Sequence, residues 1–220
     1  MEKVVIFGAS GHAKVTIDIL EKSGKYEIIG LLDSNKNIGP DVLGFKIWGG
    51  TDVVPELLKK FPGLKFFIAI GDNWRRSKIA QELLKIEPNI QFINAIHPSA
   101  ILGKNVSLGR GIMIMAGAII NADSVIGDFT IINTKASVGH ESTIMEYSSV
   151  APNSTLGGNV TVGRYSAISI SATILNGGSV GEHTVIGAGA LLTKDADSFS
   201  VYYGVPAKFI RPRELGEKYL

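Results

Sequence analysis

The 220-residue chain contains no cysteine, which excludes disulfides, thiolate nucleophiles and cysteine-based zinc sites, and no metal site is expected. It also has no block of Lys or Arg. Because 22 basic residues balance 20 acidic ones, we expect no polyanion-binding surface and no nucleic-acid partner. Long apolar runs are missing too: Gly8 interrupts the first one, so neither a signal segment nor a membrane span is expected, and we predict a cytoplasmic protein.

The pattern of the chain changes at about residue 95. Before this point, short apolar runs alternate with helix-like stretches, which is typical of βαβ units. Residues 1–95 are therefore expected to form an α/β domain with a small Rossmann-like parallel sheet. The expected strands are 4–7, 28–32 and 66–70, and the expected helices are 12–22, 53–60 and 73–85.

Residues 101–196 repeat with a period of six. The second member of all sixteen hexads is aliphatic: Leu102, Leu108, Ile114, Ile120, Ile126, Ile132, Val138, Ile144, Val150, Leu156, Val162, Ile168, Ile174, Val180, Ile186 and Leu192. Such a period predicts a solenoid, here a triangular prism of three hexads per coil with the aliphatic side chains inside. Glycine often stands third, where we expect a corner that needs positive φ. The prism is assigned to residues 96–196, and the α/β half and a tail of residues 197–220 are expected to cap it.

His140 stands fourth in its hexad, so its ring is expected to project outside the prism. A histidine suits general-base chemistry near neutral pH, and the adjacent Glu141 could fix its tautomer. The alternative is an ordinary exposed turn histidine, which is what we expect His183 to be.

A Gly-rich turn follows the first expected strand. In VVIFGASGH, residues 4–12, the turn leads into a helix whose N-terminus would favour a phosphate. The dinucleotide fingerprint is incomplete, because Ser10 and Ala13 replace its second and third glycines. The motif alone is a weak signal, and a tight βα turn without a ligand is the alternative.

Four segments together resemble one family. They are IAIGDN (68–73), NTKASVGHESTI (133–144), VAPNSTLGGNVTVG (150–163) and GVPAK (204–208). Over the whole chain they are similar to the hexapeptide-repeat sugar acyltransferases of the sialic acid O-acetyltransferase group, above all to bacterial N-acetyltransferases of UDP-linked 4-amino-4,6-dideoxy sugars. The resemblance implies a left-handed parallel β-helix, acetyl-CoA as co-substrate, a nucleotide-sugar acceptor and a homotrimer with active sites between subunits.

The resemblance also implies roles for particular residues. His140 would be the base, Glu141 would tune it, and the Gly158 backbone N–H would stabilise the oxyanion. The implied contacts to the nucleotide sugar are Ser10, Gly11, His12, Asp33, Ser34, Gly71 and Asn133, and those to acetyl-CoA are Ser149, Ile170, Ala188 and Lys208. Ser149 stands where the family has a histidine, which leaves thioester binding open.

Several alternatives remain at this point. His12 could be a solvent-facing helix-start residue, Asn133 a turn residue and Lys208 a solvated tail residue. The acceptor could be a hydroxyl instead of an amine, although the resemblance favours the amine. Because no cysteine is present, direct transfer is expected in place of an acyl-enzyme. Two other classes are left open. One is a non-catalytic nucleotide-binding β-helix protein. The other is an NAD-linked oxidoreductase, which the missing glycines of the dinucleotide fingerprint disfavour.

Overall fold

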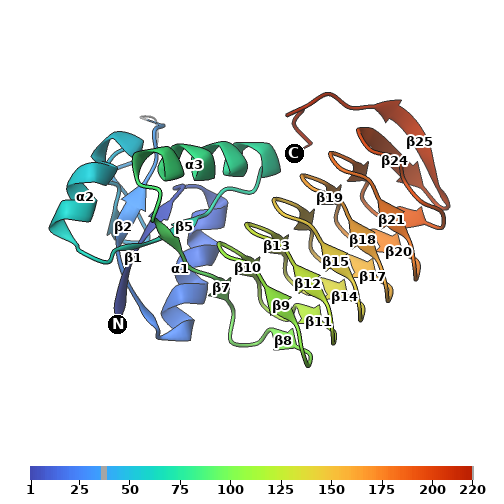
Figure 1. Cartoon of the computed structure of the whole chain (residues 1–220), viewed down its shortest axis with the longest axis horizontal. Helices are drawn as coiled ribbons and strands as arrows, with labels where there is room; N and C mark the ends of the chain where they lie inside the picture. Colours follow the sequence, from blue (N-terminus) through green and yellow to red (C-terminus); the bar gives the residue numbers. More distant parts are fainter. Residues whose placement is uncertain (36–38, 220) are drawn as a thin grey trace.

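The computed structural model describes residues 1–35 and 39–219, and Figure 1 shows an α/β domain beside a parallel β-helix. The domain has a four-stranded parallel sheet in the order β2-β1-β5-β6, and all six predicted elements are present. Its elements are β1 (Glu2–Phe7), α1 (Gly11–Ser23), β2 (Tyr26–Leu32), β3 (Asp41–Val42), β4 (Phe45–Lys46), the short 3-10 helix η1 (Thr51–Val53), α2 (Val54–Lys60), β5 (Lys65–Ile68), α3 (Asn73–Ile86) and β6 (Gln91–Phe92).

The β-helix advances by a two-residue strand every six residues, as the hexads predict. Its strands are β7 (Ala95–Ile96), β8 (Ile101–Leu102), β9 (Ser107–Leu108), β10 (Met113–Ile114), β11 (Ile119–Ile120), β12 (Val125–Ile126), β13 (Ile131–Ile132), β14 (Ser137–Val138), β15 (Thr143–Ile144), β16 (Ser149–Val150), β17 (Thr155–Leu156), β18 (Thr161–Val162), β19 (Ala167–Ile168), β20 (Thr173–Ile174), β21 (Ser179–Val180), β22 (Val185–Ile186) and β23 (Leu191–Leu192). Every third strand belongs to the same parallel sheet, so the prism has three faces.

The core of the prism consists of the second-place aliphatics. Fourteen of the sixteen are buried, from Ile114 to Leu192. Leu102 is 39% exposed and Leu108 is only partly buried, because the α/β domain does not close the first coil at this point. The domain instead packs on the outer face of β7, β10 and β13 through Ala95, Met113 and Ile131.

The prediction that the third-place glycines supply positive φ is wrong. Positive φ falls at the fifth place, in fifteen of the sixteen hexads. The third-place glycines are needed for a different reason, which is the close approach of successive coils. A Cβ at Gly139 would lie 2.2 Å from the carbonyl oxygen of Gly157, one coil further along.

The expectation that His183 is an exposed turn histidine is also wrong. Its ring is buried in an aromatic column, stacked 4.6 Å from the fifth-place residue Tyr165 and 4.8 Å from Phe199 of the segment after the hexads. The column continues through Tyr147 to Phe129. Burial lowers the pKa of His183 below its ordinary value. The N-terminal end of α3 covers this corner of the prism, since Trp74 contacts both Tyr165 and His183.

The segment after the hexads closes the far end of the prism. β24 (Ser200–Gly204) adds to β22, and β25 (Ala207–Pro212) pairs with β24 in antiparallel fashion. The chain then returns toward the end of α3 (Figure 1), where Tyr219 reaches the carbonyl of Gly71. In residues 1–35 and 39–219, no helix has the length and apolar character needed to cross a membrane.

Candidate active site

The first cavity lies where β1, β2 and β5 end, and its volume is about 310 Å³. Its lining residues are Gly8, Ser10, His12, Asp33, Asn35, Ile70, Gly71, Asp72 and Arg75. The turn after β1 can be this tight only with glycine, because Gly8 has φ +114° and a Cβ there would lie 2.7 Å from the Ala69 carbonyl oxygen. The predicted turn therefore forms one wall of a real cavity.

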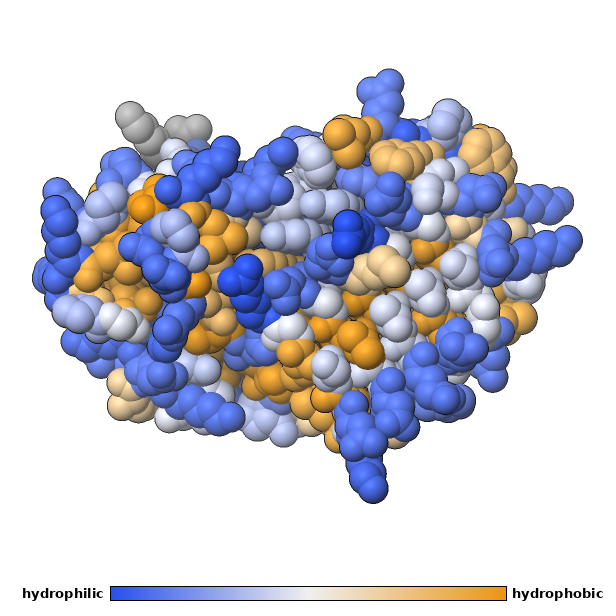
Figure 2. All heavy atoms as spheres, in the orientation of Figure 1, coloured by the Kyte–Doolittle hydropathy of each residue, from blue (hydrophilic) through white to orange (hydrophobic). Residues whose placement is uncertain are grey.

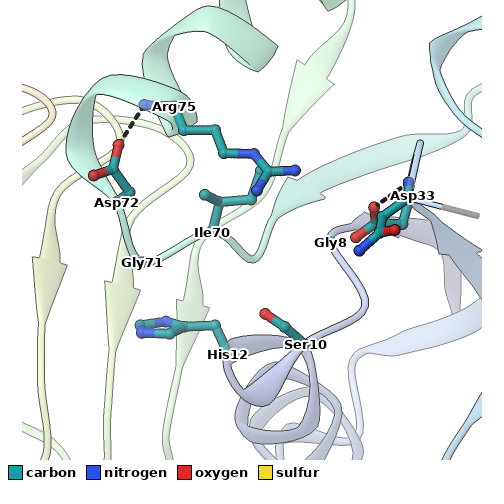
Figure 3. A pocket seen from close by; sticks show the side chains of 9 residues that line it. Gly8, Ser10, His12, Asp33, Ile70, Gly71, Asp72 and Arg75 are labelled. Carbon is teal, nitrogen blue, oxygen red and sulfur yellow. Dashed lines mark hydrogen bonds between the residues drawn. The ribbon is translucent and has the colours of Figure 1, made fainter. Parts of the chain in front are cut away.

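Polar groups converge on this first cavity (Figure 3). Ser10 precedes α1, and its hydroxyl makes no capping bond to the helix, so it is free to meet a ligand. Asp33 organises the opposite wall, because its carboxylate accepts the N–H of Ala9 at 3.0 Å and that of Asn35 at 2.9 Å. Arg75 approaches from α3. A helix N-terminus beside a guanidinium suits an anion such as a diphosphate.

The second cavity is about 460 Å³ and lies between the α/β domain and the outer surface of the prism. It brings together Asn133, Ser149, Ile170 and Ala188, four predicted contacts from four separate hexads. Its other lining residues are His12, Gly71, Ile131, Ala151, Pro152, Ala167, Ile168, Ser169, Tyr203 and Tyr219. Since His12 and Gly71 also line the first cavity, the two cavities are adjacent.

His12 stands at the junction of the two cavities and does not face bulk solvent as a helix-start residue would. Burial lowers the pKa of His12, and the charge of Arg76 lowers it further, so the imidazole is neutral near neutral pH. Its Nδ1 is buried without a hydrogen-bond partner among the described residues. A neutral ring nitrogen of this kind can accept or donate a hydrogen bond to a bound ligand.

His140 and Glu141 project from a different corner, between β14 and β15. Nδ1 of His140 lies 2.9 Å from Oε2 of Glu141, and both side chains are more than half exposed. Donation from Nδ1–H to the carboxylate leaves the Nε2 lone pair free, as a general base requires. Backbone hydrogen bonds to the coils before and after it hold this corner in place. The N–H of Glu141 donates to the carbonyl of Ala122, and the carbonyl of His140 accepts from the N–H of Asn159.

Gly158 lies directly over the His140 ring, since a Cβ there would be 2.5 Å from Nε2. Its N–H donates to Oδ1 of Asn176 at 3.2 Å, so a role as oxyanion donor requires it to exchange this partner. His140 lines neither of the two cavities. One chain thus holds the His140 corner and the cavities at separate corners of the prism.

Three predicted contacts lie outside both cavities. Gly11 is the first residue of α1 and is exposed, Ser34 is exposed after β2, and Lys208 is exposed on β25. Gly11 and Ser34 adjoin lining residues of the first cavity in sequence, whereas Lys208 lines neither cavity, and all three roles remain predictions.

Sequence reasoning missed a buried arginine that joins the two halves of the molecule. Arg76 donates from Nη1 to the carbonyls of Ile70 and Gly71 at 2.9 Å, and from Nε to the carbonyl of Phe129 at 2.7 Å. Its Nη2 donates to Oδ1 of Asn73 at 2.6 Å. Burial lowers the pKa of Arg76 to about 10. A signal was present, because Arg76 falls on the buried stripe of α3 with Asn73, Ser77, Ala80 and Leu83.

Arg75 and Tyr219 were also missed. Arg75 extends from α3 to the first cavity, and Tyr219 lines the second. No periodic pattern marks either residue, because each reaches its cavity through the packing of the two halves of the chain.

A β-helix with a cavity on its outer face, adjoining an anion-suited cavity in an α/β domain, is the architecture of a hexapeptide-repeat protein with room for two ligands side by side. Residues 3–83 match the PglD N-terminal domain. The whole chain is similar to PerB from Caulobacter crescentus, solved with CoA and GDP-perosamine: identity is 37%, coverage is 96% of this chain and 98% of that chain, and the TM-score is 0.89.

Two further relatives point to the same family. The acetyltransferase domain of PglB from Neisseria gonorrhoeae, solved with acetyl coenzyme A, is 30% identical, with coverage of 95% and 99% and a TM-score of 0.88. The UDP-N-acetylbacillosamine N-acetyltransferase of Bacillus subtilis is 34% identical over 118 residues, which is 53% of this chain and 52% of that protein. The chain spans about half, or less, of the length of the curated relatives it matches. The chain belongs to the hexapeptide-repeat sugar N-acetyltransferase family.

Proposed function

We propose that this protein transfers the acetyl group of acetyl-CoA to the 4-amino group of a nucleotide-linked amino-dideoxy sugar. The observation that carries the proposal is the adjacency of the two cavities, which share His12 and Gly71. The anion-suited cavity would take the diphosphate end of the acceptor, and the cavity on the prism would take the pantetheine and the thioester.

The nucleotide is proposed to be UDP, which the sequence resemblance implies and the name of the Bacillus relative carries. The Caulobacter relative was solved with GDP-perosamine, so GDP is the competing choice. Thiol release measured with UDP-, GDP-, TDP- and CMP-linked amino sugars at equal concentration separates these choices. The proposal of UDP fails if another nucleotide gives the highest kcat/KM.

His140 is proposed to serve as the general base for ligands bound in the cavities of a neighbouring subunit of a homotrimer. Within one chain it belongs to another corner, whereas a triangular prism packed against its own copies would bring that corner to a neighbour. Aliphatic side chains on the outer faces of the first coils support self-association: Ile101 is 59% exposed, Ile119 36% and Val125 45%. Figure 2 shows apolar surface over these first coils.

The proposed reaction is a direct transfer. The sugar nitrogen attacks the thioester carbonyl carbon, Nε2 of His140 takes a proton from that nitrogen, and the C–S bond breaks as the tetrahedral intermediate collapses. The proton then passes to the departing thiolate, so CoA leaves as the thiol. Glu141 keeps the Nδ1 proton in place throughout, which fits the 2.9 Å contact between the two side chains.

His140→Ala tests the base. The expected result is a fall in kcat of about 10²–10⁴-fold, the usual contribution of a positioned general base, with an unchanged melting temperature because the ring is exposed. His97→Ala is the matched control, because His97 lies on the prism and lines neither cavity. Unaltered turnover in the His140 variant would remove it as the base.

Mixed trimers test whether each active site combines residues of two subunits. Protomers carrying His140→Ala are co-expressed with protomers carrying Ala188→Trp, which fills the second cavity, and assemblies that contain both are isolated with two affinity tags. Sites built from two subunits regain about one active site in three in each mixed trimer, whereas sites built within one chain stay inactive. The second result would refute a shared site.

A further inference from the structure

The side chain of Tyr219 stands where the two cavities meet. Its hydroxyl donates to the carbonyl of Gly71 at 3.2 Å, so the hydroxyl of Ser149, 3.3 Å away, donates to Tyr219. Ser149 in turn accepts from Nδ2 of Asn73 at 3.3 Å. The directions of all three hydrogen bonds are therefore fixed, and they tie the tyrosine to one residue of the α/β domain and one of the prism.

The ring of Tyr219 is also held by packing. It lies against an apolar strip of the prism formed by Ala167, Val185 and Val201. The segment that carries it is fastened by an ion pair between Arg211 and Glu217 at 2.6 Å. Since the ring cannot turn without breaking these contacts, it forms a fixed wall of the second cavity.

Arg213 anchors the same segment. Nη1 of Arg213 donates to the carbonyl of His183 at 2.8 Å, and Nη2 donates to the carbonyl of Glu217. The guanidinium carbon also lies 5.8 Å from the centre of the Tyr219 ring. The segment is thereby attached to the buried aromatic column of the prism.

The position of the Tyr219 ring bears on which acyl group the second cavity can hold. Gly71 is a proposed contact of the sugar and Ser149 a proposed contact of acetyl-CoA, so the proposed function puts the reacting carbonyl close to both residues. Tyr219 is hydrogen-bonded to both residues. The methyl group of a bound acetyl thioester would therefore lie next to the tyrosine ring.

We propose that Tyr219 is a specificity-determining residue that restricts the acyl donor to acetyl-CoA by closing the cavity beyond the methyl group. The inference rests on the proposed function and adds to it the choice of donor. The buried hydroxyl stays uncharged, because burial raises the pKa of Tyr219, and its proton is already used by the Gly71 carbonyl. The tyrosine thus acts by its shape and takes no part in proton transfer.

The test compares acetyl-, propionyl- and butyryl-CoA by thiol release with the best nucleotide amino sugar. A pocket that excludes one methylene discriminates by about 10-fold or more, so the wild type is expected to prefer acetyl-CoA over propionyl-CoA by at least that factor in kcat/KM. Tyr219→Ala and Tyr219→Leu are expected to raise the propionyl-to-acetyl ratio by about 10-fold.

Two controls accompany these variants. Tyr219→Phe keeps the ring and is expected to keep the ratio within about twofold, and Leu215→Ala alters an exposed residue of the same segment without touching the cavity. Thermal unfolding of each variant shows whether the protein is still folded, and Tyr219→Leu retains apolar contact if the alanine variant does not fold.

The outcomes are distinct. A propionyl-to-acetyl ratio that rises only when the ring is removed supports the inference. An equal fall for all three donors in folded variants, or a wild type that uses propionyl-CoA as well as acetyl-CoA, overturns it. Failure of the wild type to release thiol from any donor with any nucleotide amino sugar would instead overturn the proposed function.

Discussion

Arg76→Met is the substitution from which we expect the largest loss of stability outside the prism core. The guanidinium is fully buried and donates to carbonyls of the α/β domain and of the prism. Methionine keeps similar length and apolar volume but removes every donor. The two halves of the molecule would lose one of the polar contacts that fix their relative position, while the bonds from Asn73 to the prism would remain.

The magnitude follows from the acceptors that would be left. Three backbone carbonyls, those of Phe129, Ile70 and Tyr147, accept a hydrogen bond from Arg76 and from no other donor among the described residues. An unsatisfied buried carbonyl costs about 1–3 kcal/mol, and release of the buried charge offsets part of the sum. Because three such carbonyls would cost about 3–9 kcal/mol before this offset, we expect a net loss of about 3–5 kcal/mol. The melting temperature should fall by roughly 6–20 °C.

The assay is thermal unfolding of Arg76→Met, Arg76→Lys and the neighbouring Arg75→Met. Lysine restores a charge but cannot reproduce the planar fork of donors, so an intermediate value is expected. Arg75 is exposed, and its variant is expected to unfold within about 0.5 kcal/mol of the wild type. An Arg76→Met protein that melts within about 2 °C of the wild type would refute the reasoning.

Two further predictions concern charge. Arg75→Ala is expected to raise KM for the nucleotide sugar by about 10-fold while leaving KM for acetyl-CoA unchanged, because Arg75 lines only the first cavity; equal changes in both constants would contradict this. Burial lowers the pKa of His183 in the folded protein. As the pH falls below about 6.5, the unfolded chain therefore binds a proton at this residue before the folded protein does, so the free energy of unfolding decreases on acidification. His183→Phe should lose less stability than the wild type between pH 7.5 and pH 5 in urea unfolding; an identical loss in both proteins would show that His183 does not titrate in this way.

The sequence predicts the prism well because one rule repeats in every coil. An aliphatic side chain is required inside at each second place, and this demand does not depend on anything outside the prism. The first places carry a weaker pattern with a period of 18 residues. On the face that the rest of the chain covers they are Met113, Ile131, Ser149, Ala167 and Val185, four of which are apolar, whereas the other two faces mix Ser and Thr with aliphatics such as Ile119 and Val125.

The error at His183 and the missed site residues share one physical cause. The hexad places His183 outside the prism, but a side chain outside the prism is exposed only where no other element covers it. The aromatic residues 18 residues apart at Phe129, Tyr147 and Tyr165 were the available signal that this corner is covered. Arg75 and Tyr219 reach the site through contacts between distant segments, which no local pattern specifies, and the buried stripe of α3 marks Arg76 as buried without showing what it contacts.

The geometry separates binding from turnover. A single chain already forms both cavities, so the proposed contacts to the nucleotide sugar and to CoA need no partner, whereas His140 lies at another corner of the prism. In the proposed trimer each subunit would supply the base for a neighbour's cavities. It follows that a charge introduced at Ile119 or Val125 to prevent assembly should abolish turnover while leaving binding of the nucleotide sugar to the first cavity largely intact.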